Sequence, residues 1–158
     1  MATWNGFRQE ARARDAMQLA ELATLAHDIA GDNHRFRFVQ LPFNLAMTEA
    51  LTLGNQSIGG GEKTVMEAAS DLHITLIASA SLLQGQVARN LPGFVAEALG
   101  LEDDAQRSLQ FVRSSPGITT ALVGMSHVEH VRANAKLIGV PPATVDQFSK
   151  LFTRGERA

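Results

Sequence analysis

Near the end of the chain an apolar segment, 119–124, ends at Gly124, and after Met125 and Ser126 the chain takes up helical spacing. The first turn of a helix has free backbone N–H groups and a partial positive charge, and both attract anions. We therefore predict a phosphate-binding junction where this strand turns into a helix.

Other kinds of site fit the sequence less well. The glycine-rich segment 54–64 has a glutamate between its last glycine and its lysine, whereas a phosphate loop needs Gly-Lys-Ser/Thr in direct sequence, so we interpret it as a flexible loop. His127 and His130 lack a third ligand at a convincing spacing, so we predict no metal site. Ser79 and Ser81 lie outside a G-x-S-x-G elbow, which argues against a hydrolase.

The composition restricts the class of protein. With 158 residues, 45% of them hydrophobic and 19% charged, the chain is expected to form one soluble domain over residues 1–158. A net charge of −2 gives no basic field for nucleic acid or for an acidic membrane surface. The chain has no cysteine, no apolar signal region and no membrane-spanning segment, which predicts a cytoplasmic location.

Apolar segments alternate with helical ones along the chain. The predicted strands are 1–4, 35–45, 74–82 and 119–124. The last two are nearly continuous in apolar or small residues, which is typical of strands covered on both faces. The predicted helices cover 8–31, 63–72, 103–117, which starts at an acidic cap, 127–137, and a final stretch, 141–152, that follows two prolines.

The helix predicted for 127–137 continues the anion site. At helical spacing Val128, Val131 and Leu137 share one apolar face with Asn134.

Repeated strand–helix units imply a parallel sheet with helices outside it. A (β/α)8 barrel needs eight strands and about 250 residues. We therefore predict an α/β fold that is half of a (β/α)8 TIM barrel, with four βα units and a C-terminal helix. Such a half has unpaired strand edges, which proteins normally cover.

Several of these segments resemble the second half of the aldo-keto reductases. The resemblance rests on ATWNG (2–6), FVQLPFNL (38–45), ITLIASASLLQG (74–85) and AQRSLQFVRSSPGITTALVGMSHVEHVRANAKL (105–137), which match that family's strands five to eight in order. The family folds as a (β/α)8 barrel and uses NADPH to reduce carbonyl compounds. The resemblance therefore implies the NADP(H)-binding half of an oxidoreductase.

The resemblance also implies a role for individual residues. Ser126 would bind the adenosine 2′-phosphate, with His130 where an arginine or glutamine is common, and Asn134 would hold the adenine. Gln40 would contact the nicotinamide carboxamide. The predicted cofactor-binding residues are Gln40, Ser79, Leu82, Gln84, Gly85, Gly124, Ser126, His130 and Asn134.

Some positions depart from the family pattern, and each departure weakens the expected affinity for NADPH. Ser79 stands where a tyrosine commonly stacks on the nicotinamide ring, and Ala133 replaces a glutamate. The remaining departures are Ala2 and Thr3 in place of a Ser-Asn pair, Ser81 in place of a proline, and Met125 in place of a possible lysine contact.

The catalytic tyrosine, lysine, aspartate and histidine of that family belong to the first half of the barrel. This chain contains no tyrosine, and its lysines, Lys63, Lys136 and Lys150, fall on predicted outer helices or loops. We therefore assign no catalytic residue and expect the chain alone to be inactive, with a small carbonyl substrate only in an intact barrel.

Two interpretations stay open. The chain is either a truncated aldo-keto reductase or a stand-alone, non-catalytic half-barrel that binds nucleotides or self-assembles. Because 119–124 would be an exposed edge in a monomer, we expect either a homodimer or a missing N-terminal half-barrel as the partner.

Overall fold

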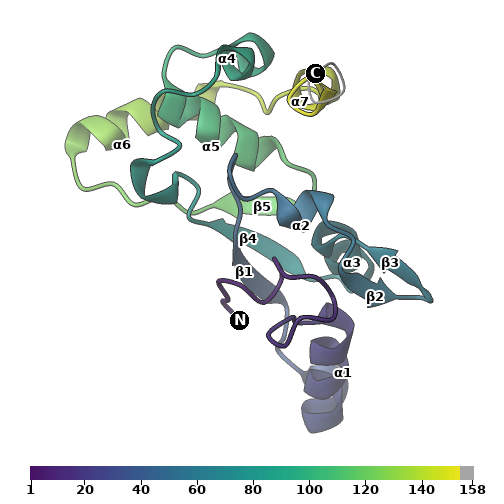
Figure 1. Ribbon diagram of the computed structural model, residues 1–158. Helices are drawn as coiled ribbons and strands as arrows, with labels where there is room; N and C mark the ends of the chain where they lie inside the picture. Colours follow the sequence, from purple (N-terminus) through teal and green to yellow (C-terminus); the bar gives the residue numbers. More distant parts are fainter. Residues whose placement is uncertain (154–158) are drawn as a thin grey trace.

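The computed structural model describes residues 1–153, and residues 154–158 of the predicted domain lie outside the described residues. Its main sheet contains β1 (Phe38–Pro42), β4 (Thr75–Ser79) and β5 (Ile118–Ala121) in the order β1-β4-β5. Both pairings are parallel. The strands lie in the middle of the molecule, with α1 (Leu19–Ala30) beyond one end and the C-terminal helices toward the other (Figure 1).

The first predicted strand is reduced to one parallel bridge between Ala2 and Gln40. The Gln40 N–H donates to the carbonyl of Met1 at 2.8 Å, and the Thr3 N–H donates to the carbonyl of Gln40 at 3.0 Å. This segment therefore lies beside β1, and the four predicted strands follow one another in chain order across the sheet. That parallel order confirms the predicted half-barrel fold.

One face of the sheet forms the core. Val39, Leu41, Leu76 and Ala78 are buried and pack with residues of α3 (Val65–Asp71) and α5 (Asp104–Ser114). The opposite face is open within the described chain, where Phe38 is 55% exposed. The prediction that the segments 74–82 and 119–124 are covered on both faces is wrong for the described residues, because Ile77 is only half-buried and Thr120 is exposed.

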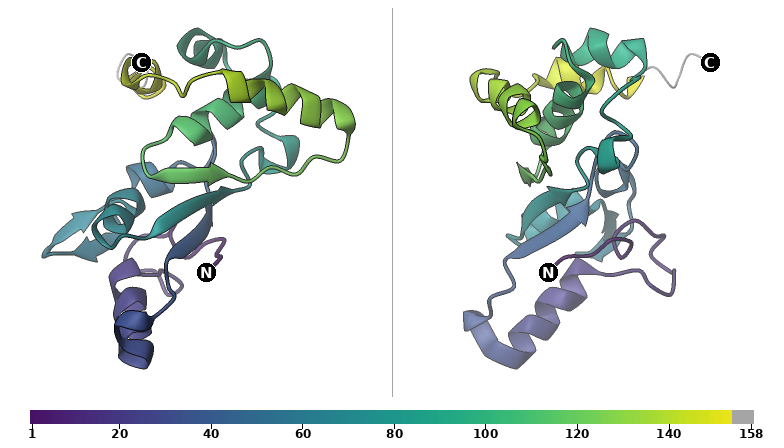
Figure 2. Two further views of the ribbon diagram at one scale, coloured as in Figure 1. Left: turned by 180° about the vertical axis from the view of Figure 1, so that it is seen from behind. Right: turned by 90° about the vertical axis from the view of Figure 1, so that its left-hand side faces the viewer.

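Helices and hairpin strands complete the structure (Figure 2). The remaining α-helices are α2 (Glu49–Thr52), α4 (Gly93–Leu99), α6 (Val128–Ala135) and α7 (Val145–Ser149). Short 3-10 helices are η1 (Gly31–Asn33), η2 (Leu83–Gly85) and η3 (Lys136–Gly139). Helix α5 begins at Asp103, whose side chain accepts from the Gln106 N–H, so the predicted acidic cap is confirmed. Sequence reasoning missed α4.

Helix α1 starts later than predicted, at Leu19, because residues 8–18 form turns instead. A side chain from far along the chain determines that start. The Gln56 amide donates to the carbonyl of Met17 at 3.0 Å and accepts from the N–H of Leu19 at 2.9 Å. The Met17 carbonyl and the Leu19 N–H are therefore both paired with Gln56. A helix that began at residue 8 would lose these two hydrogen bonds.

The glycine-rich segment is an ordered hairpin rather than a flexible loop. Strands β2 (Gln56–Ile58) and β3 (Gly61–Lys63) pair antiparallel across Gly59 and Gly60, whose φ angles are 62° and 82°. Two successive left-handed residues form the tight turn that matches strand twist, and glycine adopts that conformation without steric cost. The hairpin projects beside α3, at the opposite end of the molecule from α6 (Figures 1 and 2).

No helix among residues 1–153 is both long and apolar enough to cross a membrane.

Candidate functional site

A cleft of about 580 Å³ opens between the loop after β4, the start of α5 and the segment from β5 to α6. It brings together most of the predicted cofactor-binding residues, although they lie on separate parts of the chain. Those that line it are Leu82, Gln84, Gly85, Gly124, Ser126, His130 and Asn134. The anion site predicted at the strand-to-helix junction thus forms one wall of a real cleft.

The other two predicted residues, Gln40 and Ser79, do not line this cleft. Gln40 is half-buried in the middle of β1, where its register partner is Ile77. Ser79 is the last residue of β4, next to the cleft residue Ala80, and its carbonyl accepts from the N–H of Phe43 at 3.1 Å. These two residues belong to the sheet, and the other seven belong to the cleft.

The loop after β4 is held in an unusual backbone conformation. Ala80, Leu83 and Gln84 have φ angles of 52°, 45° and 53°, values that residues with a side chain rarely adopt. Each such residue costs of order 1 kcal/mol or more, and strain of this kind gathers at functional sites. The Asn44 amide donates to the carbonyl of Ala80 at 3.0 Å and helps to fix the loop.

A buried hydroxyl also lies in this loop. Ser81, which stands where the related family has a proline, lines the cleft and is 1% exposed. Its Oγ has no hydrogen-bond partner among the described residues. An unpaired buried hydroxyl is costly, so the cleft wall is not arranged for stability alone.

The start of α6 faces the cleft without a cap. His127 is the N-cap residue, but its side chain makes no capping hydrogen bond. Its ring instead contacts that of His130 edge-on, with 5.2 Å between the ring centroids. Ser126 precedes this turn and is exposed. The first-turn N–H groups therefore have no side-chain acceptor at the N-cap position and remain suited to an anion.

Polar side chains of α5 hold α6 in place. The Gln106 amide donates to the carbonyl of Ala133 at 2.7 Å, and the Arg113 guanidinium donates to the carbonyls of Leu137 and Val140. The Gln110 amide donates to the carbonyl of Pro141 at 2.8 Å. The position of one cleft wall therefore depends on hydrogen bonds to backbone carbonyls.

The two valines of α6 lie on the surface of the described chain. Val128 is 60% exposed and Val131 is 47% exposed, whereas Leu137, in η3, is buried.

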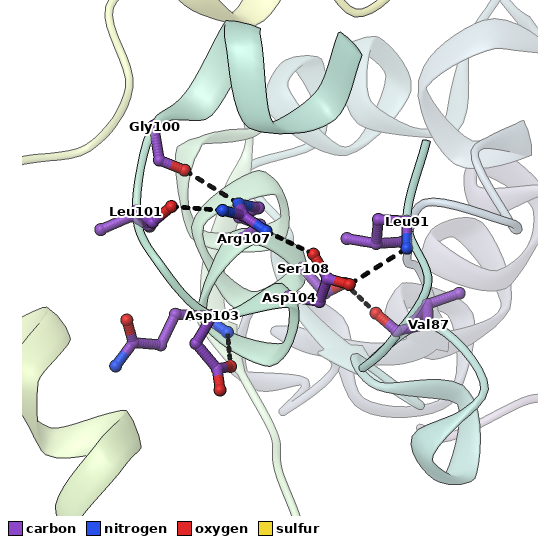
Figure 3. A network of polar contacts seen from close by, with 9 residues as sticks. Val87, Leu91, Gly100, Leu101, Asp103, Asp104, Arg107 and Ser108 are labelled. Carbon is purple, nitrogen blue, oxygen red and sulfur yellow. Dashed lines mark hydrogen bonds and ion pairs between the residues drawn. The ribbon is translucent and has the colours of Figure 1, made fainter. Parts of the chain in front are cut away.

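An ion pair fixes the start of α5 (Figure 3). Asp104 accepts from the Leu91 N–H at 3.1 Å and from the Arg107 guanidinium at 2.5 Å. These hydrogen bonds, first that of Leu91 and then that of Arg107, hold the pKa of Asp104 below its ordinary value. Arg107 also donates to the carbonyls of Gly100 and Leu101, so it is fully engaged away from the cleft.

Asp103 is a cleft residue that sequence reasoning missed. The sequence predicts Asp103 only as a helix cap, and a capping pattern does not indicate which loop the residue faces. Figure 3 shows its carboxylate apart from the pair formed by Asp104 and Arg107. Asp103 and His130 are the titratable side chains among the described residues that line the cleft. Within residues 1–153 no group of three or more histidine or acidic side chains could hold a metal ion.

No family model and no curated protein matches this chain by sequence. Solved structures do match it. The holo form of aldo-keto reductase AKR11C1 from Bacillus halodurans aligns with a TM-score of 0.57 and 12% identity over 77% of this chain and 43% of that one. A putative 2,5-diketo-D-gluconic acid reductase B aligns with a TM-score of 0.60 and 12% identity over 85% of this chain and 42% of that one.

A third match is the thermostable aldo-keto reductase Tm1743 in complex with the inhibitor epalrestat, with a TM-score of 0.55, 17% identity, and coverage of 79% of this chain and 42% of that one. The chain therefore spans less than half the length of these structures. At such identities the likeness shows the fold, and the fold is that of part of an aldo-keto reductase barrel. The resemblance found in the sequence is confirmed at this level.

Replacement of Asp104 by alanine should destabilise the chain by about 1 kcal/mol at pH 7, because it removes hydrogen bonds to a charged acceptor. The folded-state pKa of Asp104 is lowered, so its contribution is present above about pH 4 and is lost as the pH falls through the folded-state value. Urea unfolding at pH 7 and pH 3 should show the difference shrinking in acid. Asp71→Ala, which removes an exposed ion pair with Lys63, is the control and should change stability by less than about 0.5 kcal/mol. An Asp104→Ala defect as large at pH 3 as at pH 7 would contradict the assignment.

Proposed function

We propose that the cleft binds the adenosine and phosphate part of NADP(H), as the cofactor-binding half of an aldo-keto reductase-type oxidoreductase. The observation that carries the proposal is the joint lining of one cleft by the loop after β4 and by the segment from Gly124 to the end of α6. Those segments hold seven of the residues assigned to the cofactor from sequence. The fold likeness to aldo-keto reductases supports the same class of ligand.

The chemistry of the donors fits such a ligand. The uncapped first turn of α6 and the hydroxyl of Ser126 supply hydrogen-bond donors for a phosphate. The half-buried amide of Asn134 can both donate and accept, as a purine edge requires. Around Gly85 and Gly124 no heavy atom lies within 4 Å of the position of an added Cβ, so a ligand has room to approach the backbone.

The chain supplies binding rather than the proton transfer of carbonyl reduction. NADPH supplies a hydride when it is bound next to a carbonyl compound. A reductase also needs a general acid, and this chain has no tyrosine. Lys63 pairs with Asp71 beside the hairpin, away from the cleft. We therefore propose that hydride transfer takes place only in an intact barrel. The alternative function is nucleotide binding by a non-catalytic half-barrel.

Titration of NADPH into the chain tests this proposal. Ser126→Ala and Asn134→Ala should each weaken NADPH binding about tenfold, because each removes a hydrogen bond to the ligand. NADH should bind less tightly than NADPH to the wild-type chain. Ser57→Ala, on the distant hairpin, is the control and should leave affinity unchanged. Equal affinities for NADPH and NADH would contradict the assignment of Ser126 to the 2′-phosphate.

We also propose that a second half-barrel covers the open face of the sheet. Phe38, Ile77 and Thr120 lie on that face, since Phe38 alternates with buried Val39 and the register joins Ile77 to Thr120. The outer edge of β5 has no strand neighbour among the described residues. An exposed parallel edge beside a partly apolar face is the kind of surface that proteins cover.

Light scattering on the purified chain distinguishes the two possible partners. A stable dimer would support two copies completing one barrel, and replacement of Phe38 by aspartate should then shift it to monomer. A soluble monomer that becomes more stable only when an N-terminal half-barrel is added would support the second partner. A stable monomer that does not bind such a half-barrel would contradict both partners.

A further inference from the structure

We propose that Asp103 is a specificity-determining residue. Its carboxylate repels a ribose 2′-phosphate bound in the cleft, and so it reduces the ratio of the affinity for NADPH to the affinity for NADH. This inference rests on the proposed function of the cleft and concerns the choice between two cofactors that differ in one phosphate group. It assigns Asp103 a role beyond capping α5.

The carboxylate lies where it can act on a ligand. Asp103 lines the same cleft as Ser126, His130 and Asn134. One of its oxygens accepts from the Gln106 N–H at 3.0 Å. The Gln106 N–H thus holds the Asp103 carboxylate at the wall of the cleft.

No fixed positive charge on the described cleft wall balances it. The residues that line the cleft include neither lysine nor arginine. Arg107, the nearest arginine along the chain, is held by Asp104 and by the carbonyls of Gly100 and Leu101. Arg113 is likewise held by carbonyls beyond α6. Among the described residues, the other titratable side chain of the cleft is His130.

The consequence follows from Coulomb's law. A 2′-phosphate carries up to two negative charges, and a carboxylate across a hydrated cleft repels them. In such a screened setting the effect on binding is modest, roughly three- to tenfold. NADH lacks this phosphate, so the same carboxylate affects its binding little. Removal of the Asp103 charge should therefore raise the affinity for NADPH and leave the affinity for NADH nearly unchanged.

The fold permits a clean substitution. Asparagine caps helices about as well as aspartate, so Asp103→Asn keeps the hydrogen bond to Gln106 and removes only the charge. The matched control is Glu102→Gln, which removes the neighbouring acidic charge at a residue that does not line the cleft.

The experiment is titration of NADPH and NADH into the full chain, as wild type, Asp103→Asn and Glu102→Gln, at low and high salt. We expect Asp103→Asn to tighten NADPH binding three- to tenfold at low salt, to leave NADH within twofold, and to lose most of its effect at about 0.5 M salt. Glu102→Gln should change neither affinity by more than twofold.

The outcomes separate this inference from the proposed function. If the wild-type chain binds NADPH but Asp103→Asn changes neither affinity, or changes both equally, the role of Asp103 is refuted while the cofactor site stands. If neither cofactor binds to any of the three chains, the proposed function and this inference fail together.

Discussion

The candidate site depends on one set of hydrogen bonds, those from the side chains of α5 to backbone carbonyls at and beyond α6. Helix α6 has no fully buried residue among those described, so apolar packing does not fix it. Gln106, Gln110 and Arg113 recur along α5 at helical spacing and hold carbonyls of the following segment instead. Loss of such a partner leaves a buried polar group unpaired, which costs about 1–3 kcal/mol. The width of the cleft is therefore determined by α5.

The same helix links the cleft to the sheet. Phe111 and Val112 on its other side belong to the core under the strands, and Ser108 donates to the carbonyl of Val87 in the loop after β4. One helix thus orients both walls of the cleft against a single buried face. The open face of the sheet, where Gln40 lies in the middle of β1, is the face that the proposed second half-barrel would cover.

Much of this arrangement was predictable because its signals are local. The segment 119–124 and the helix after it, the cap at Asp103 and the parallel order of the strands all follow from periodicity and capping rules. The start of α1 was not predictable, since Gln56, far along the chain, determines it. The hairpin at Gly59 and Gly60 was missed because its strands are very short.

The residues of the candidate site were likewise predictable only in part. Ser126, His130 and Asn134 were found because they lie on one short segment that resembles a family pattern of strand, Gly-x-Ser and helix. Asp103 was missed as a cleft residue because its local role as a cap fully explained it, and only the tertiary structure places it in the same cleft as residues of α6. The strained loop at Ala80, Leu83 and Gln84 has no sequence signal either, since none of these residues favours a positive φ.

Hydrogen–deuterium exchange of the whole chain with and without NADPH tests whether the cofactor binds in the cleft, because it locates binding without assuming which residues matter. We predict slower exchange in two separate segments, 80–88 and 124–135, and unchanged exchange in the hairpin of β2 and β3. Protection confined to other segments, or no protection at saturating NADPH, would contradict the assignment of this cleft as the cofactor site.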